Sequence, residues 1–390
     1  MHQRTYGNMK SELYNPRISG EVRYAYNGEY SYFFPNDLPF DIDVDKGLLS
    51  KMDKALISIA RLDGKVSQIP LEERDMLLRP FTLMESAEST AIEGTNTTVE
   101  DIYKSERVNE KDPEKSEDNK EVLNYRDALN YAISNVGANI TEELLLETHK
   151  ILISGVRGEN KKPGQFRSVP VLVGKYGDTL ETARYVPPLP EDVPWKFINL
   201  LDYINSNQDR PLLCAALSHY QFETIHPFTD GNGRLGRLLI MLILKVKGVI
   251  QFPVLYLSGY FNENRRTYID SLNAIREEDD FDTWLHLFLD AIIIQSDNAS
   301  KLIDILQEYR TSILSGEDNI NMIHLKNSLF VNPFVRISDV ETICGVNQTT
   351  ARRMVMKLMD RGLLEETTGF KRNQLFVCRP IMDIINSYGR

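Results

Sequence analysis

Side chains able to do chemistry gather in one twelve-residue segment, which reads HPFTDGNGRLGR from His226 to Arg237. The triplet Gly231–Gly233 predicts a tight turn, and apolar residues that recur at helical spacing from Leu235 onward predict a helix directly after it. A glycine turn that leads into a helix presents unpaired backbone N–H groups and the positive end of the helix dipole. The segment therefore predicts a binding site for an anion.

Four polar side chains of this segment suit a nucleotide site. Arg234 and Arg237 oppose the helix dipole by about 0.3–1 kcal/mol each, a conflict that bound phosphates would relieve. Asp230 offers the hard oxygen ligand that Mg²⁺ uses beside phosphates, and His226 is a base that titrates near neutral pH. Each residue also has an ordinary interpretation: a helix N-cap for Asp230, a hydrogen-bonded loop histidine for His226, and solvent exposure for the arginines. Their combination within one segment favours the chemical interpretation.

The segment matches the full signature HxFx(D/E)GNGRxxR, and on it the chain resembles the Fic family, adenylyltransferases that transfer AMP to protein hydroxyls. The flanking stretches LSHYQFETIHPF and LYLSGYFNENRRTYIDSL are similar to the family's surrounding helices, so the likeness extends over roughly residues 40–310. The resemblance implies a mostly α fold, with a Fic-type helical core and a small β-hairpin flap over the active site.

By this resemblance, His226 is the general base that takes the proton from a Ser, Thr or Tyr hydroxyl of a target protein. The hydroxyl oxygen then attacks the α-phosphate of ATP and pyrophosphate leaves, while Asp230 binds the Mg²⁺ that bridges the α- and β-phosphates. Phe228 packs inward to orient the loop, and Gly233, where kinase-like relatives carry Lys, favours AMP transfer over phosphorylation. The implied phosphate contacts are Gly231, Asn232 and Gly233 at the anion hole, with Arg234 and Arg237 on the outer phosphates.

A flap is expected within Pro163–Pro190, where PGQFRSVPVLVG is β-rich and bounded by Pro and Gly. By the resemblance, the residues after its strand contact the nucleotide and register the target chain by strand addition. These residues are Val173, Gly174, Lys175 and Tyr176. Tyr268 in RRTYID matches a position beside the adenine. A plain structural hairpin and a packed helix tyrosine are the alternatives for these two features, and both stay open.

A second motif, STAIEG from Ser89 to Gly94, matches the family's inhibitory pattern (S/T)xxxE(G/N) and precedes the catalytic core. Gly94 has the character of a C′ residue, which places Glu93 in the last helical turn, where the dipole disfavours a carboxylate. A Glu93–Arg237 ion pair would relieve that conflict and withhold Arg237 from the γ-phosphate, so that ATP binds out of line or not at all. The alternatives are a surface glutamate before a capping glycine, and a glutamate that supports removal of AMP by orienting a water.

The catalytic segment needs helices to hold it, and the 3.6-residue apolar period predicts them over most of residues 45–310. Helices are expected at residues 45–62, 81–92, 121–152 with a break at 137–141, 194–205, 212–225, 233–247, 264–276 and 282–309. Residues 1–40 are expected to form an irregular arm without an assigned role, and residues 103–120 an exposed charged loop. The expected domains are an N-terminal region (1–120) with an inhibitory helix (81–94), a catalytic core (121–310), and a linker with a winged helix (311–390).

The C-terminal part differs from the rest in charge. Residues 331–390 carry 9 Lys or Arg and 6 Asp or Glu, a balance of +3, which leaves −14 for the remainder of a chain whose total is −11. They resemble a winged helix, with helices at Ile337–Gly345 and Asn347–Arg361 and a wing that turns near Gly369. The cations of its basic face are Arg352, Arg353, Lys357, Lys371 and Arg372. Contact with DNA, which requires such a face, and contact with protein, as a homodimer or a docked target, both stay open.

Composition bounds the class of protein. With 390 residues, 42% hydrophobic and 26% charged, the chain is in the globular range, which excludes a wholly disordered or fibrous protein. A net charge of −11 excludes a surface that follows phosphate backbones throughout. The three cysteines lie far apart and no apolar run approaches the roughly 20 residues of a membrane span, so a cytoplasmic protein without membrane contact is expected. Two other functions stay open, a winged-helix regulator whose core senses nucleotide and an enzyme that chiefly removes AMP.

Overall fold

Helices dominate the structure, a computed structural model that describes residues 14–25, 28–108, 112–156, 162–174, 177–206, 209–370 and 372–388. The chain divides into two units. The first comprises Met1–Ala60, Asn124–Gln251 and Tyr260–Ile293, and the second comprises Arg61–Leu123, Phe252–Gly259 and Ile294–Arg390. The contiguous domain boundaries expected near residues 120 and 310 stay predictions. Within the described residues, no helix is both long enough and apolar enough to span a bilayer.

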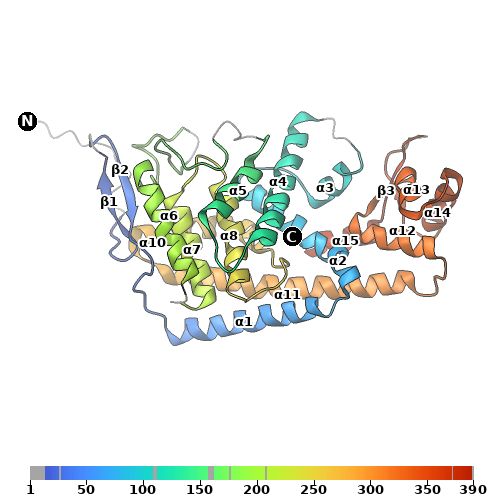
Figure 1. Ribbon diagram of the computed structural model, residues 1–390, viewed down its shortest axis with the longest axis horizontal. Helices are drawn as coiled ribbons and strands as arrows, with labels where there is room; N and C mark the ends of the chain where they lie inside the picture. The colour runs from blue at the N-terminus through green and yellow to red at the C-terminus, as the bar shows by residue number, and fades with distance from the viewer. Residues whose placement is uncertain are drawn as a thin grey trace, which may run out of the picture. The chain divides into compact units, whose positions relative to one another are not determined.

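The first unit contains a helical bundle (Figure 1). Its helices are α5 Glu142–Ile153, α6 Val193–Asn205, α7 Pro211–Ile225, α8 Asn232–Val246 and α10 Arg265–Glu278, with the 3-10 turn η3 Pro190–Asp192 ahead of α6. α7 packs against both α6 and α8, and α8 also packs against α5. The apolar period predicted these helices to within a few residues, and the prediction is confirmed.

Four helices run from residues of one unit into residues of the other: α1 Lys46–Ser67, α4 Pro113–Asn135, α9 Leu257–Glu263 and α11 Phe281–Leu314. The remaining helices belong to the second unit. They are α2 Leu71–Ile92, α3 Val99–Ser105, α12 Ile320–Val331, α13 Ile337–Cys344, α14 Gln348–Asp360 and α15 Arg379–Tyr388.

α7 and α8 approach closely because α8 carries a glycine where they meet. From Leu212 to Ile225 every residue of α7 except Glu223 is buried, so this helix lies inside the bundle. A Cβ on Gly236 of α8 would lie 2.4 Å from Glu223 Oε1 and 3.1 Å from Phe222 Cδ1. The close approach holds the end of α7 and the start of α8 in a fixed relation, and the predicted catalytic segment joins these two ends.

The N-terminal arm contains a hairpin, so the expectation of an irregular arm is wrong for this part. β1 Gly20–Tyr24 and β2 Ser31–Pro35 pair antiparallel, with Gly20 opposite Pro35 and Tyr24 opposite Ser31. The N–H of Phe33 in β2 donates to the carbonyl of Val186 at 2.9 Å. The hairpin therefore depends on a pairing partner far along the chain, which no local pattern could indicate.

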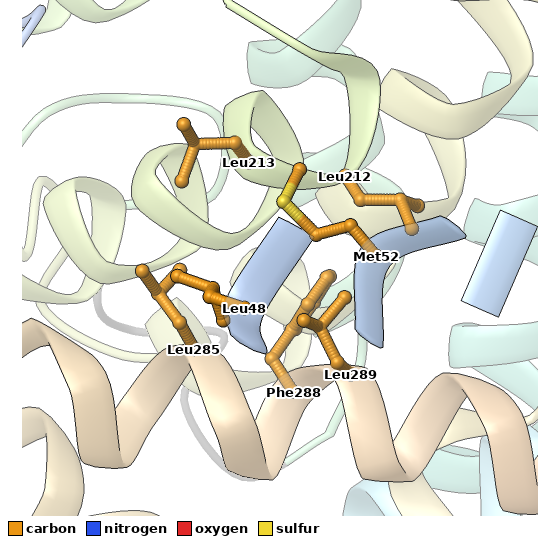
Figure 2. Close-up of a pocket in the computed structure, with 7 residues that line it drawn as sticks. All are labelled: Leu48, Met52, Leu212, Leu213, Leu285, Phe288 and Leu289. Atoms are coloured by element: carbon orange, nitrogen blue, oxygen red, sulfur yellow. The ribbon is translucent and has the colours of Figure 1, made fainter. Parts of the chain in front are cut away.

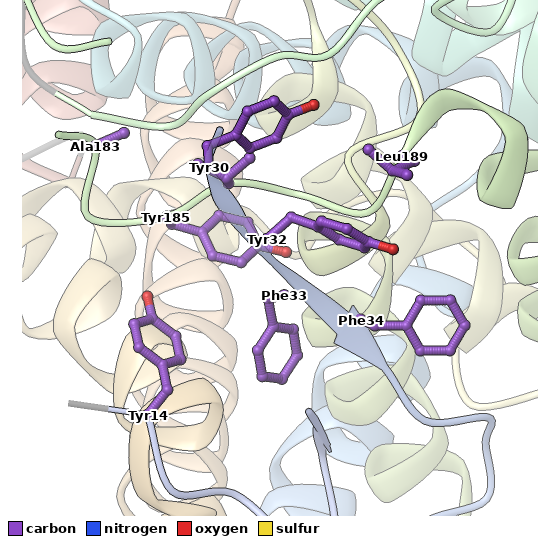
Figure 3. Packing of buried hydrophobic residues seen from close by; sticks show 9 residues of the cluster. Tyr14, Tyr30, Tyr32, Phe33, Phe34, Ala183, Tyr185 and Leu189 are labelled. Atoms are coloured by element: carbon purple, nitrogen blue, oxygen red, sulfur yellow. The ribbon is translucent and has the colours of Figure 1, made fainter. Parts of the chain in front are cut away.

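Aromatic side chains of the hairpin form a buried cluster with the segment around Tyr185 (Figure 3). The members of this cluster are Tyr14, Tyr30, Tyr32, Phe33, Phe34, Ala183, Tyr185, Val186 and Leu189. Tyr14 adds a hydrogen bond from its hydroxyl to the carbonyl of Arg184 at 2.6 Å. The arm thus packs on the second half of the predicted flap segment.

A small apolar hollow lies where α1, α7 and α11 meet (Figure 2). Its lining side chains are Leu48 and Met52 from α1, Leu212 and Leu213 from α7, and Leu285, Phe288 and Leu289 from α11. Ligand sites place a few polar groups among apolar ones to orient the ligand. This hollow has only apolar side chains, so it is a seam between helices.

The charged segment 103–120 is largely helical, and the prediction of an exposed loop is wrong. α3 ends at Ser105 and α4 begins at Pro113. Thr98 and Asp101 form a capping box at the start of α3, and Lys115 Nζ lies 2.6 Å from Asp101 Oδ1. These helices are stabilised by capping groups and charge pairs, which a search for apolar periodicity cannot detect.

The C-terminal elements lie where the winged-helix prediction places them. A three-stranded antiparallel sheet has the order β3 Phe334–Arg336, β5 Leu375–Val377 and β4 Glu365–Glu366. α13 ends at Gly345 in the left-handed conformation, and Asn347 caps α14 by accepting the N–H of Thr350 at 2.9 Å. Gly369, with φ 65°, lies at the predicted turn between β4 and β5. The name winged helix stays an interpretation of this order.

Candidate active site

His226 follows α7 in a left-handed backbone conformation, with φ 49° and ψ 60°. Its N–H donates to the carbonyl of Phe222 at 2.9 Å and closes the helix. This conformation costs a residue other than glycine about 1–2 kcal/mol, so surrounding contacts must hold it. Strain at a residue able to transfer protons marks the loop as a candidate active site.

The imidazole of His226 is turned back toward α7. Its Nδ1 lies 3.4 Å from the carbonyl oxygen of Glu223, and a carbonyl oxygen only accepts hydrogen bonds. With the proton on Nδ1, Nε2 is the ring atom able to accept another proton. The ring is half-buried, which suits a base that must meet a substrate hydroxyl.

Asn232 closes the turn after His226. Its Oδ1 accepts the N–H of Phe228 at 2.9 Å, and its Nδ2 donates to the carbonyl of Phe228 at 2.8 Å. The residue is 2% exposed. Its carboxamide therefore already has partners in the loop backbone, and its predicted contact with nucleotide stays a prediction.

Phe228 points into the core, as predicted, and its ring stacks on that of His149 with centroids 3.7 Å apart. His149 Nδ1 accepts the N–H of Gly164 at 2.9 Å, so Nε2 carries the proton and donates to the carbonyl of Asp230 at 2.9 Å. Burial lowers the pKa of His149 to about 4, which keeps the ring neutral. No sequence pattern indicated this residue, because its partners are backbone groups.

Asp230 and Gly231 form the turn that starts α8. Asp230 Oδ1 accepts the N–H of Gly231 at 2.6 Å and lies 3.5 Å from Arg234 Nη2. Gly231 is the N-cap, with φ 79°, and a Cβ there would lie 3.0 Å from Ile153 Cγ2 and 3.4 Å from His149 Nε2. The position therefore requires glycine on both conformational and steric grounds.

Two arginines are buried in the first turns of α8, Arg234 at 4% and Arg237 at 3% exposure. Cations buried at the positive end of a helix favour an anion there. Gly233 lies beside them and is half-buried. Among the residues that the structure describes, no group of three His, Cys, Asp or Glu side chains could hold a metal ion. A single carboxylate such as Asp230 is the set that Mg²⁺ uses when phosphates supply the other ligands.

The flap segment forms less sheet than predicted. Val173 makes one antiparallel bridge with Tyr185, whose carbonyl accepts the Val173 N–H at 2.9 Å. The proline in SVPVLVG lacks an N–H and interrupts the expected ladder. Val173 and Gly174 are exposed, as residues that meet a ligand must be. The other predicted flap contacts, Lys175 and Tyr176, lie outside the described residues.

Tyr268 lies in the core at 3% exposure, and its ring stacks on Phe261 with centroids 4.7 Å apart. His219 lies between two partners: its Nδ1 is 3.0 Å from the carbonyl of Gly236 and its Nε2 is 2.8 Å from the Tyr268 hydroxyl. Because the carbonyl only accepts, Nδ1 donates to it and the hydroxyl donates to Nε2. These contacts are those of a packed helix tyrosine, and the predicted adenine contact stays a prediction.

The predicted inhibitory motif lies in the second unit, at the end of α2. Glu93 is the C-cap of this helix, and Gly94 follows with φ 102°, as the C′ prediction requires. Ser89 is buried and Glu93 is exposed. The geometry of the cap is confirmed, although α2 begins at Leu71, well before the predicted start. The inhibitory role stays a prediction.

Two adjoining parts of the chain match models of one family. Residues 139–244, which include the segment HPFTDGNGRLGR, match the Fic/DOC family, and residues 49–134 match the Fic/DOC family N-terminal region. The chain belongs to the Fic/DOC family.

Named relatives agree with this assignment. The protein adenylyltransferase Fic of Nematostella vectensis is 28% identical over 256 residues, which cover 60% of this chain and 56% of that protein. The protein adenylyltransferase fic-1 of Caenorhabditis elegans is 32% identical over 133 residues, 33% of this chain and 23% of that protein. The chain thus spans about half or less of the length of these relatives.

Solved structures share the fold. A Fic family protein from Desulfovibrio desulfuricans G20 has a TM-score of 0.56 at 20% identity, over 86% of this chain and 97% of that chain. A Fic-1 fragment from C. elegans has a TM-score of 0.50 at 25% identity, over 65% of this chain and 73% of that chain. The mostly helical Fic fold predicted from the sequence is confirmed.

Proposed function

We propose that the chain is an auto-inhibited protein adenylyltransferase, which transfers AMP from ATP to a Ser, Thr or Tyr hydroxyl of a target protein and of itself. One observation carries this proposal: a short turn joins His226, whose Nδ1 faces a carbonyl, to the start of α8, where Arg234 and Arg237 are buried. A base and an anion site joined by one short turn suit transfer of a phosphoryl group to a hydroxyl. Relatives named protein adenylyltransferase support the same activity.

The reaction follows from what these side chains can do. Nε2 of His226 accepts the hydroxyl proton while the oxygen forms its bond to the α-phosphorus. The bond from the α-phosphorus to the bridging oxygen breaks, and pyrophosphate leaves with that electron pair. Arg237 binds the γ-phosphate and Arg234 the neighbouring phosphate. The amides of Gly231–Gly233 donate to the anionic oxygens, where charge develops in the transition state.

Asp230 is the residue that would hold Mg²⁺. The bound ion would neutralise charge on the α- and β-phosphates. The side chain of Asp230 is 30% exposed and lies 3.5 Å from Arg234 Nη2, so its carboxylate belongs to the same turn as the phosphate-binding groups. One carboxylate beside phosphate oxygens suits this ion, so the residues present fit it.

The exposed residues Val173 and Gly174, together with Lys175 and Tyr176, are proposed to register the target chain. Val173 already makes a backbone bridge to Tyr185, which supports strand addition at this position. A target segment held in this way would bring its hydroxyl toward His226.

Glu93 is proposed to inhibit the enzyme. As the C-cap of α2 it lies where helix carbonyls disfavour a carboxylate, and its side chain is exposed. Pairing with Arg237 would withhold the cation that binds the γ-phosphate. The two residues belong to different units, so this pairing is proposed from their helix-end electrostatics alone.

Incubation of the full chain with Mg-ATP labelled at the α-phosphate tests the activity and the inhibition. Glu93→Gly is expected to raise self-labelling about tenfold or more, because Arg237 becomes able to bind the γ-phosphate. His226→Ala is expected to lower it by at least about 100-fold, because the base is lost. Equal labelling of Glu93→Gly and the unmodified chain contradicts the inhibition. Labelling that survives His226→Ala contradicts the assigned base.

The same assay separates the two alternative functions. An enzyme that chiefly removes AMP would release label from a pre-labelled target, and Glu93→Gly would slow that release. A core that only senses nucleotide would bind ATP without any labelling, and His226→Ala would not change its binding.

We also propose that the C-terminal elements bind a partner, with duplex DNA and protein both open. Arg352, Arg353 and Lys357 are exposed on α14, and Arg372 is exposed beyond the Gly369 turn, whereas Lys371 lies outside the described residues. Cations on one helix and on the adjacent turn suit a phosphate backbone. Protein contact, as a homodimer or a docked target, is the competing proposal, and dependence of binding on salt separates the two.

A further inference from the structure

Arg167 holds the end of the helix that presents His226. Its side chain is 3% exposed. Its Nε donates to the carbonyl of His226 at 2.8 Å, and its Nη2 donates to the carbonyl of Ile225 at 3.3 Å. Its own N–H donates to the carbonyl of Pro227 at 2.9 Å. One residue therefore donates hydrogen bonds to three consecutive carbonyls where α7 ends.

The same guanidinium holds both ends of the flap. Nη2 of Arg167 donates to the carbonyl of Pro188 at 2.5 Å, and Nη1 donates to that of Val169 at 3.5 Å. Val169 precedes the bridge between Val173 and Tyr185, and Pro188 follows it. The base of the flap is thus joined to the end of α7 by one side chain.

The hydrogen-bond partners of the carbonyls at the end of α7 support this connection. The last carbonyls of an α-helix have no partner within the helix and must find one elsewhere. The carbonyl of Thr224 accepts the hydroxyl of Tyr185, which belongs to the flap bridge. Ile225, His226 and Pro227 are satisfied by Arg167. All four carbonyls are therefore met from the flap side.

Arg167 is a buried cation that binds these carbonyls. Within the described part of the chain it forms no ion pair, and each of its side-chain hydrogen bonds goes to a carbonyl. Burial lowers its pKa to about 10, so it is charged at neutral pH. A buried charge is tolerated only where its hydrogen bonds are well made. A guanidinium holds five N–H donors in a fixed plane on three nitrogens, whereas the three donors of a Lys ammonium share one nitrogen.

We infer that Arg167 is a positioning residue that sets the strained conformation of His226 and couples it to the flap. The inference rests on the proposed function, since it concerns the geometry of the proposed base. Arg167 acts through backbone carbonyls and not on the reactants. The anion-binding turn is held separately, by Asn232 and His149. Loss of Arg167 therefore misplaces the base and the flap while the turn still binds nucleotide.

Three variants of the full chain test this role. Arg167→Met removes the charge and the fork, and Arg167→Lys keeps the charge but loses the fork. Lys196→Met is the matched control, because Lys196 is also a buried cation of the first unit, at 2% exposure. Its Nζ lies 2.8 Å from Asp37 Oδ1 and over the ring of Trp195. Asp37 is 51% exposed at its side chain, so it stays solvated in the control.

Rate and nucleotide affinity are measured separately, in chains that also carry Glu93→Gly. Arg167→Met is expected to lower kcat for AMP transfer about 100-fold, with the Kd for ATP changed by less than about threefold. Arg167→Lys is expected to lose about tenfold in kcat. Lys196→Met is expected to stay within about threefold in both. A kcat of Arg167→Met within about threefold of its parent, or an equal loss of nucleotide affinity, overturns the inference.

Hydrogen exchange provides a readout that does not need activity. The N–H groups of Val173 and His226 are hydrogen-bonded to Tyr185 and Phe222. Both Arg167 variants should speed their exchange about tenfold or more, while Lys196→Met should leave it unchanged. Unchanged exchange in the Arg167 variants refutes the positioning role. If the Arg167 variants speed exchange as expected but the parent chain transfers no AMP, the proposed function fails and the positioning role stands.

Discussion

Three histidines, His149, His219 and His226, differ in how far they are buried. His226 is half-buried, whereas His149 and His219 are fully buried and use both ring nitrogens in hydrogen bonds. Burial lowers the pKa of His149 to about 4 and that of His219 to about 3, with the charge of Arg237 adding to the shift of His219. Both rings are therefore neutral at pH 7. Protonation of either one must accompany its exposure, which ties stability to pH.

We expect the free energy of unfolding to fall as the pH falls, in part because of His219. Its folded pKa of about 3 lies below the unfolded value of about 6.5, so its contribution is complete above about pH 6.5 and declines below it. Between about pH 7 and pH 4 the loss amounts to about 3 kcal/mol. His219→Gln keeps a donor and an acceptor but does not titrate, so its unfolding free energy should decline less by about that amount.

Chemical denaturation at several pH values between 4 and 7 measures the difference. His286→Gln is the control, because the side chain of His286 is 39% exposed and lies on α11. The control should follow the unmodified chain. If His219→Gln also follows it, the burial of a neutral His219 is not what makes stability depend on pH.

The residues of HPFTDGNGRLGR could be identified from the sequence because they are close together in the chain. A base, a carboxylate and two cations are also residue types whose side chains indicate their chemistry. His149 and Arg167 could not. Both act on backbone carbonyls, of Asp230 in the first case and of His226 in the second. Every residue carries a carbonyl, so no residue type marks the partner. Only the fold shows that these two side chains hold the loop.

Elements that follow from a local apolar period were predicted well, whereas those held by capping groups or by distant contacts were not. The end of α7 and the start of α8 follow from the apolar period and from Gly231. Its φ of 79° is not helical, so the chain turns there before α8 begins. β2 depends on the N–H of Phe33 meeting the carbonyl of Val186, a contact between distant segments. A period of side chains along one segment carries no information on such pairing.

The contact between α7 and α8 is testable through its glycine. Gly236→Ala is expected to destabilise the chain relative to Gly64→Ala by about 1–3 kcal/mol. The new Cβ at Gly236 would lie 2.4 Å from Glu223 Oε1, which can move, and 3.1 Å from Phe222 Cδ1, which is packed. At Gly64 in α1 a Cβ meets nothing within 4 Å, so alanine should stabilise that helix by up to about 1 kcal/mol.

Urea unfolding of the two variants and the unmodified chain supplies these free energies. Labelling with ATP provides a second readout, because Glu223 also offers its carbonyl to His226 Nδ1. Gly236→Ala is expected to lose activity, and Gly64→Ala to keep it. Equal stability of the two variants would mean that α7 and α8 tolerate a side chain between them.

Across the whole molecule, charge is distributed unevenly. Residues 331–390 carry 9 Lys or Arg against 6 Asp or Glu, so their balance is +3 in a chain whose total is −11 and whose remainder is therefore −14. A strongly anionic remainder is repelled by DNA, so binding, if the C-terminal elements provide it, must be local. The exposed cations Arg352 and Arg353 of α14 are where such binding would be lost first.

Binding of the full chain to random duplex DNA should therefore weaken steeply as salt rises, since each phosphate contact releases counterions. Arg352→Ala with Arg353→Ala should weaken binding to all sequences alike and lower the slope of log K against log salt by about 2. Lys54→Ala with Arg61→Ala removes the same charge from exposed positions of α1 and should leave that slope unchanged. Equal effects of the two pairs would show attraction by net charge alone. An absence of salt-dependent binding would leave a protein, a second copy or a target, as the partner of α14.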